Sequence, residues 1–424
     1  MRELSTDILV VGGGSAGCFA AISAARTGAK VILVEKNGML GGTTTGGMVN
    51  FPGLFHAWGK QIISGPCWES IMRCVEYGGA VLPPFPYKSE HHNKQQILID
   101  IFTYTCILDE MCLEAGVRLQ LHSMIAAVEE CEEGVEATVT TKDGALRVSA
   151  KVLIDATGDA DALRLVGCEY RISETTQPAT LINDLGGYDP EKIDEKAFRE
   201  YLDGCYKSGI LTLEDSQGQD IYKRLIKRRI HMHIPAPCAH TSEGKTELEI
   251  NARRTLFRIL KCLSGFDGLQ GIRVVRSGYE CGVRETVRIV GEKEITADEY
   301  LNAEIREDSV CHAFYPIDLH RSVDIKQIFL KDGKVPCVSY GSLVPRGAKH
   351  LLVAGRCLSS DTDANSALRV QATCMATGQV VGVAAALCVK HGYDVYNIPM
   401  ETLKNELHRL GAIVPGDVVF TSEH

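Results

Sequence analysis

The sequence lacks the features that mark several classes of protein. Its 16 cysteines include no Cys-x-x-Cys pair, so the common spacing of zinc and iron–sulfur ligands is absent and we expect no metal. The cysteines are scattered along the chain, which indicates reduced thiols rather than a disulfide framework. Lys and Arg number 45 against 54 Asp and Glu, and the formal net charge of -9 argues against a general affinity for nucleic acid.

Long apolar runs and targeting signals are missing as well. The longest candidate, Val380 to Val389, has at most about half of the ~20 residues that a membrane span needs. The apolar run that follows Thr6 breaks at Gly12, so it does not have the length of a secretory signal. We therefore expect a cytoplasmic protein with no membrane span.

The composition that is present is ordinary for a soluble globular protein. The 424 residues are 45% hydrophobic and 23% charged, which allows a large core and two domains. We predict an α/β fold: a Rossmann-like domain with a parallel sheet, helices and an antiparallel insertion, next to a mixed α+β substrate or cap domain. The first domain is expected at 1–167 and 341–395, the second at 168–340, and a C-terminal tail segment at 396–424.

The first 35 residues have the pattern of a βαβ unit. Asp7 to Val11 and Lys30 to Glu35 are short apolar runs typical of buried parallel strands. Ser15 to Thr27, between them, is alanine-rich and has helical spacing. The turn before this predicted helix carries a G-x-G-x-x-G motif, made of Gly12, Gly14 and Gly17.

Each glycine of this motif has a physical role in a dinucleotide site. Gly12 permits the tight turn, Gly14 lets the backbone approach a pyrophosphate, and Gly17 lets the helix pack on the strand. The helix N-terminus supplies unpaired N–H groups to the phosphates. Glu35 ends the second strand at the roughly twenty-residue interval where a carboxylate bonds ribose hydroxyls, so the motif predicts a bound dinucleotide without a 2′-phosphate.

Three further segments favour FAD over NAD as that dinucleotide. Leu40 to Thr43 places two glycines where the chain passes a flavin's phosphates, and Ile154 to Asp159 looks like the second nucleotide strand of FAD enzymes. Leu352 to Arg356 is a short strand before a polar loop, which is followed by Thr377 to Gln379 inside a predicted helix.

With these motifs, the chain resembles the FAD-dependent oxidoreductase family of the glutathione-reductase-like flavoprotein superfamily, which is distantly related to fumarate reductases. The matching elements are Gly12–Gly17, Gly41–Thr43, Ala156–Asp159, Gly282–Glu285, Tyr315–His320, and Gly355–Arg356 through Arg369 to Gly378–Gln379. They extend over nearly the whole chain. The family is functionally mixed, so the resemblance implies the cofactor and not the substrate.

The resemblance implies an FAD lying across the domain interface, with the start of a helix at 367–391 pointing at the flavin. We expect the FAD to be non-covalent, because covalent relatives carry a histidine in the loop that here reads Thr43 to Gly47. There is no second complete glycine motif for NAD(P)H, so the electron acceptor stays unidentified. The expected FAD-binding residues are Gly12, Gly14, Ser15, Ala16, Gly17, Glu35, Lys36, Gly42, Thr43, Ala156, Thr157, Gly158, Gly355, Arg356, Gly378 and Gln379.

Five residues are candidates for the chemistry on the substrate. His320 is suited to act as a base, and Asp318, two residues before it on an extended segment, either lines the same cleft or bonds His320 in a domain hinge. Arg369 either holds a substrate acid or forms a salt bridge between domains. Arg284 is expected to pair with its neighbour Glu285 in a helix or turn. His56 follows the glycine-rich loop and either faces the flavin ring or is an ordinary core or surface histidine.

These residues point to hydride transfer between flavin N5 and a carbon of a small polar substrate. A CH–OH or CH–CH donor fits equally, including a sugar or a hydroxy or carboxylic acid. Two other functions stay open: a flavoenzyme without net redox, such as a dehydratase or isomerase, and a non-catalytic FAD-binding protein that uses its cap for interactions. An oligomer is compatible with the sequence.

We expect His231 and His233 on a solvated strand or loop, and a loop over 361–366.

Overall fold

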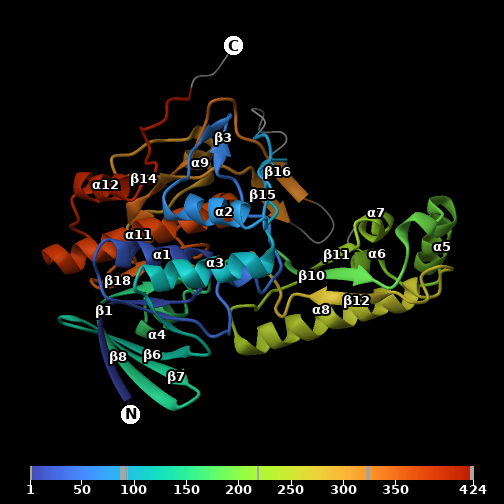
Figure 1. Cartoon of the computed structure of the whole chain (residues 1–424), viewed down its shortest axis with the longest axis horizontal. Coiled ribbons are helices and arrows are strands. Elements are labelled where there is room, and N and C mark those ends of the chain that lie inside the picture. Colours follow the sequence, from blue (N-terminus) through green and yellow to red (C-terminus); the bar gives the residue numbers. More distant parts are fainter. Residues whose placement is uncertain (1, 86–91, 93, 217–218, 321–324, 421–424) are drawn as a thin grey trace.

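The computed structural model describes residues 2–85, 92, 94–216, 219–320 and 325–420. Figure 1 shows a larger body that contains both chain ends and a smaller unit, in green and yellow, that projects from one side. The two parts have largely separate hydrophobic cores.

The larger body is built on a seven-stranded sheet. Its strands, in spatial order, are β5 (Arg118–Gln120), β2 (Val31–Val34), β1 (Arg2–Val11), β8 (Gly144–Asp155), β7 (Gly134–Thr141) and β6 (Met124–Cys131), with β18 (Leu351–Val353) also paired to β8. One edge of β8 pairs with β1 in parallel along its length. Its other edge pairs antiparallel with β7 over 144–150 and parallel with β18 over 153–155. This confirms the predicted α/β fold with a parallel sheet and an antiparallel insertion.

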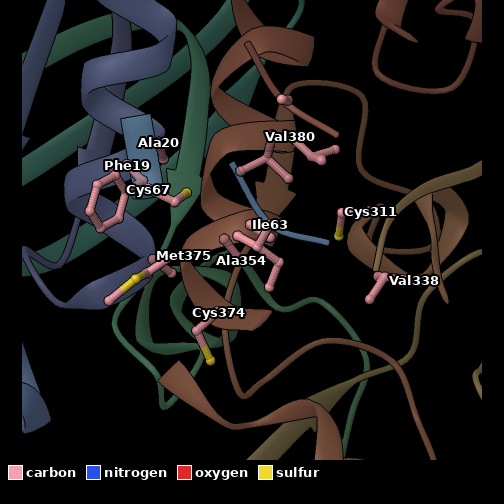
Figure 2. Close-up of a cluster of buried hydrophobic side chains, with 14 of the residues drawn as sticks. Phe19, Ala20, Ile63, Cys67, Cys311, Val338, Ala354, Cys374, Met375 and Val380 are labelled. Atoms are coloured by element: carbon pink, nitrogen blue, oxygen red, sulfur yellow. The ribbon is translucent and has the colours of Figure 1, made fainter. Parts of the chain in front are cut away.

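Two helices made of small residues cross the sheet with their backbones in close approach. They are α1 (Ser15–Arg26) and α11 (Gln371–His391), which lie side by side in Figure 1 and interleave buried side chains in Figure 2. A Cβ atom built on Gly378 would lie 2.0 Å from the carbonyl oxygen of Ala16, and one on Gly382 would lie 2.2 Å from that of Ala20. Glycine is therefore required at both positions by the packing of the two helices.

The remaining helices of the larger body are short. They are α2 (Pro66–Glu76), α3 (Ile101–Glu114), α4 (Asp161–Val166), α9 (Ala297–Asn302), α10 (Thr362–Leu368) and α12 (Met400–Arg409). Helix α3 starts at Ile101, where the side chain of Asp100 accepts a hydrogen bond from the Thr103 amide and caps the first turn. The predicted loop over 361–366 is wrong: Asp361 caps α10 in the same way.

The smaller unit has a three-stranded antiparallel sheet covered by helices on one face. Its elements are β10 (Ala179–Gly186), β11 (Arg229–Ile234), β12 (Arg273–Ser277), α5 (Glu195–Lys207), α6 (Leu213–Ser216), α7 (Ile221–Ile226) and α8 (Ser242–Leu263). Its core joins Leu181 and Met232 of the sheet to Phe198 and Ile259 of the helices. We call this unit, residues 179–283, the cap.

Four two-stranded sheets are found in addition. They are β3 (His56–Ala57) with β4 (Lys60–Gln61), β9 (Tyr170–Ile172) with β13 (Val287–Ile289), β14 (Ser309–His312) with β17 (Cys337–Ser339), and β15 (Ile317–His320) with β16 (Ile325–Ile328). Buried residues of 295–338 share the core of the larger body, as do Leu403 and Leu407 of α12. The predicted second domain therefore contains both the cap and segments that pack on the first core.

Helix α11 is long and apolar enough to cross a membrane by length and composition, which the count of uninterrupted apolar residues did not predict. In its most apolar stretch, 94% of the residues are buried inside the protein. This is the packing of a core helix, and Figure 1 shows α11 beside α1.

We expect Gly378→Ala to lower the free energy of unfolding by roughly 1–3 kcal/mol or more, because the added methyl overlaps the Ala16 carbonyl. Chemical denaturation followed by circular dichroism measures this. Gly204→Ala is the matched control: Gly204 is exposed in α5, and a Cβ there meets no atom within 4 Å. That change should be neutral or stabilise by up to about 1 kcal/mol. Equal effects at the two positions would contradict the packing argument.

Candidate functional site

A cavity of about 820 Å³ lies between the larger body and the cap. This volume is at the upper end of the roughly 300–1,000 Å³ that ligand pockets occupy. At one end it is lined by the β1–α1 turn and the residues after β2, and at the other by polar residues of β11, β15 and the segment before α11. We call these the glycine end and the arginine end.

The glycines at the glycine end leave a cradle for a ligand. A Cβ on Gly12 would lie 2.5 Å from the carbonyl oxygen of Ala156, and one on Gly17 would lie 1.7 Å from that of Gly12. A Cβ on Gly14 would meet only Gly42, whose Cα is 3.8 Å away. Gly12 and Gly17 are thus required by the fold, whereas Gly14 borders open space that a side chain would fill.

Two helix N-termini open on this cavity without a side-chain cap. Six other helices of the described chain, α3, α5, α7, α8, α9 and α10, begin with an Asp or Thr that accepts from the first turn. The N-cap residues of α1 and α11 are Gly14 and Val370, neither of which has such a bond, and both line the cavity. Their free amide groups suit a ligand with negative charge at two places.

Glu35 is held at the end of β2 by backbone amides. Its carboxylate accepts from Gly13 N at 2.7 Å and from Asn37 N at 2.8 Å. Burial raises the pKa of Glu35 and the two amide bonds oppose that shift. The side chain still lines the cavity, so its remaining lone pairs can accept from ribose hydroxyls.

A charged network encloses the cavity where the cap meets the larger body. Asp159, after β8, binds Arg356 and accepts from Lys245 of α8 at 2.6 Å. Burial alone would raise the pKa of Asp159, but Arg356 and Lys245 lower it below its ordinary value. Arg356 also donates to Gly158 O at 2.5 Å. The charge of Arg356 is therefore largely committed to Asp159 and ties the two parts together.

Most of the predicted FAD-binding residues line this one cavity. They are Gly12, Gly14, Ser15, Ala16, Glu35, Lys36, Gly42, Thr43, Ala156, Thr157, Gly158, Gly355 and Arg356. Gly17 packs α1 on the strand end instead, as its role in the motif requires. Gly378 and Gln379 lie in the middle of α11 and, contrary to the prediction, do not line the cavity. The helix begins at Gln371, and Val370, Gln371 and Cys374 line the cavity there.

Asp318 and His320 form a hydrogen-bonded pair at the arginine end. Both lie on β15 and line the cavity, and His320 Nε2 is 2.9 Å from Asp318 Oδ2. Gln327 Nε2 donates to the other carboxylate oxygen at 3.0 Å. Burial would raise the pKa of Asp318, but His320 and then Arg369 lower it to about 2. Burial also lowers the pKa of His320, against the bond from Asp318, so the ring is neutral at pH 7.

Arg284 and Arg369 line the cavity beside this pair. Arg284 Nη1 donates to Pro178 O at 2.5 Å, and its Nη2 is 3.2 Å from His233 Nε2. The predicted Arg284–Glu285 ion pair is wrong. Glu285 pairs with Arg288 at 2.5 Å, because residues three apart on this turn bring those side chains together.

His56 is placed away from the cavity. Its ring stacks on Phe85 with centroids 3.7 Å apart, and its edge meets Trp68 at 5.3 Å. Burial lowers the pKa of His56 to about 4. Of the two alternatives that the sequence leaves open, the structure favours a core histidine.

The cap contributes two histidines that the sequence alone places in solvent. His231 and His233 of β11 line the cavity, and the ring of His233 meets that of His320 edge-on at 5.0 Å. Burial and then nearby arginines lower their pKa values to about 3 and about 2, so both are neutral. The sequence signal for this is an alternation of apolar residues and histidines, Ile230, His231, Met232 and His233. In a strand, alternate side chains point to opposite faces, so when the apolar residues pack in the cap core both histidines lie on the other face, which lines the cavity.

Gly14→Val should give folded protein that binds FAD at least about tenfold more weakly, because its side chain enters the space for the pyrophosphate. Absorbance of the purified protein near the flavin band and reconstitution with FAD measure this. Gly14 has φ -77, an extended conformation that valine adopts, so the variant should keep its circular dichroism spectrum. Gly204→Ala is the control with full FAD content. A yellow, FAD-loaded Gly14→Val protein would remove the motif from the binding site.

Comparison with known proteins agrees with this cradle. A family model described as FAD-dependent oxidoreductase matches residues 7–407. A digeranylgeranylglycerophospholipid reductase of Methanosphaera stadtmanae is 25% identical over 159 residues, which cover 37% of this chain and 38% of that protein. The chain thus matches less than half the length of that curated relative.

Solved structures with similar folds are distant in sequence. A geranylgeranyl bacteriochlorophyll reductase-like protein of Thermoplasma acidophilum is 12% identical, with a TM-score of 0.47, over 97% of this chain and 85% of its own. A p-nitrophenol 4-monooxygenase of Pseudomonas putida is 11% identical, with a TM-score of 0.44, over 96% and 84%. Because the family model spans nearly the whole sequence, the chain belongs to the FAD-dependent oxidoreductase family.

Proposed function

We propose that this enzyme oxidises or reduces a carbon of a small polar substrate at the arginine end of the cavity, with His320 exchanging the accompanying proton. The observation that carries the proposal is the buried Nδ1 of His320, which has no hydrogen-bond partner among the described residues and lies in the same cavity as the cofactor cradle. When bound, FAD supplies the acceptor or donor of the hydride. The protein supplies the orientation and the proton transfer.

The bond to Asp318 sets the proton positions on His320. A carboxylate with a pKa of about 2 only accepts hydrogen bonds at pH 7, so the Nε2 of His320, 2.9 Å away, carries the ring proton. Its Nδ1 is then a lone pair, and this atom is buried and has no hydrogen-bond partner among the described residues. A neutral imidazole with a free, oriented lone pair is a general base.

Asp318 is itself held from three sides. Gln327 donates to its Oδ1, its backbone amide donates to Ser366 Oγ at 3.0 Å, and its carbonyl accepts from Arg369 at 3.4 Å. This fixes the direction of the carboxylate and, through it, the plane of the His320 ring. Such a pair accelerates proton transfer by keeping the reacting nitrogen aimed at the substrate.

The same base serves more than one substrate type. Oxidation of a CH–OH group requires loss of the hydroxyl proton, and oxidation of a CH–CH group requires loss of a proton from the neighbouring carbon. His320 Nδ1 can accept either, and the protonated ring returns it in the reverse direction. A flavoenzyme without net redox stays a second possibility. Membership of the oxidoreductase family speaks against the non-catalytic alternative.

Anaerobic mixing of the FAD-loaded protein with a panel of sugars, sugar acids and hydroxy acids tests the proposal. Lasting loss of the flavin absorbance band with one class supports net oxidation of that class. Product formation with no lasting change in the band would replace it with the dehydratase or isomerase alternative.

His320→Gln should keep FAD and slow reduction of the flavin by the active substrate about 10²–10⁴-fold, because the general base is lost. Stopped-flow absorbance measures the rate. His391→Gln is the matched control, since His391 is exposed at the end of α11. Unchanged kinetics in His320→Gln would exclude this residue as the base.

Asp318→Asn should also slow reduction, by about 10²-fold or more, because the amide donates to Nε2 and forces the proton onto Nδ1. The acid limb of the remaining activity, where the rate falls as the pH decreases, should lie at a lower pH than in the wild type. Asp318 raises the pKa of His320, and the base works only when neutral, so removing the charge extends activity to more acidic conditions. The pH profile of the reduction rate measures this. A shift of the acid limb to higher pH would contradict the assignment.

A further inference from the structure

Arg284 and Arg369, which line the cavity, differ from two other buried or partly buried arginines that form ion pairs. Arg288 pairs with Glu285 and Arg356 pairs with Asp159. No carboxylate of the described residues lies within 4.0 Å of the guanidinium groups of Arg284 or Arg369. The Nε of Arg369 is buried and has no hydrogen-bond partner in that part of the chain.

Neutral groups hold both side chains in place. Gln177 Oε1 accepts from Arg369 Nη2 at 3.4 Å, and Pro178, the next residue, accepts through its carbonyl from Arg284 Nη1 at 2.5 Å. These acceptors aim the two guanidinium groups without cancelling their charge. Burial and then the charge of Arg369 lower the pKa of Arg284 to about 9, which shows that the two cations repel each other.

The other charged groups at the arginine end do not compensate. Arg224 of α7 also lines the cavity and adds a third cation, which lowers the pKa of His231. The one carboxylate among the described residues at this end is Asp318, and its two oxygens are already bonded to His320 and Gln327. Among the residues that the structure describes, three arginines therefore face a single carboxylate, while His231, His233 and His320 are neutral.

Cations that are partly buried without counter-ions are costly, and such sites are characteristic of places where a ligand supplies the opposite charge. Guanidinium groups bind planar carboxylates with two parallel hydrogen bonds. We propose that the arginine end binds the substrate as a carboxylic acid anion, with a dicarboxylate preferred over a monocarboxylate. This rests on the proposed function and names its substrate class.

The bound acid completes the geometry of the site. Arg369 contacts both the Asp318 carbonyl and Gln177, and Gln177 Oε1 also accepts from the backbone amide of His320 at 3.2 Å. A carboxylate on Arg284 and Arg369 is thus connected, through Gln177, to the strand that carries the base. The acid group anchors the substrate, and the carbon next to it lies toward His320 Nδ1.

Isothermal titration of the FAD-loaded protein at low ionic strength tests this with four probes: succinate, butyrate, succinamide and inorganic phosphate. We expect succinate to bind at least about tenfold more tightly than butyrate, and butyrate more tightly than the uncharged succinamide. Arg284→Gln and Arg369→Gln should each weaken succinate binding at least about tenfold. Arg254→Gln, which removes the same charge from an exposed site on α8, should change it less than about twofold.

Each outcome decides the proposal. Succinamide binding as tightly as succinate, or phosphate binding more tightly than both acids, overturns it with the wild-type protein alone, so a misfolded variant cannot obscure the result. His320→Gln should keep the succinate affinity within about threefold, because that ring is neutral. If acids bind selectively but His320→Gln does not slow flavin reduction, the substrate class stands and the proposed base fails. If only neutral substrates bind and reduction still depends on His320, the proposed base stands and the substrate class fails.

Discussion

The close approach of α1 and α11 organises the site. Because Gly378 and Gly382 have no side chains, the backbone of α11 lies directly against Ala16 and Ala20 of α1. This contact brings the N-termini of both helices to one cavity, at Gly14 and Val370. Neither end has a side-chain cap, so both present amide groups to a ligand. The packing of the two helices thus brings two sites of partial positive charge to one cavity.

The electrostatics of the cavity differ between its two ends. At the glycine end the charges are matched: Lys36 pairs with Glu280 at 3.3 Å, and Lys245 with Asp159 at 2.6 Å. At the arginine end the cations exceed the carboxylates among the described residues. A cofactor whose phosphates are met by helix ends and backbone amides needs few cations of its own. The unmatched arginines are therefore best explained by the substrate.

The sequence predicts the glycine end well because its signals are local. A G-x-G-x-x-G turn and a carboxylate at the end of the next strand are set by one βαβ unit, and in the structure Gly14 precedes α1, Glu35 follows β2, and both line the cavity. Gly378 shows where this fails. A glycine required by helix packing and one required by a cofactor look the same in a sequence, and only the position of Ala16 distinguishes them. The sequence also did not predict the partner of Glu285. Which arginine pairs with Glu285, Arg288 or Arg284, depends on the path of the backbone between them.

The cap histidines show what a single strand cannot reveal. His231 and His233 pair across the sheet with Ile182 and Thr180, and all four line the cavity. The other face of β11 packs in the cap core, so this face must cover something. It covers the arginine end, where Arg284 connects His233 to the segment that also holds Arg369. Because burial and then the nearby arginines lower the pKa values of these histidines to about 3 and about 2, the cap adds polar surface without adding further positive charge. A covering surface of this kind strengthens the attraction of partly buried cations for an acid group that enters.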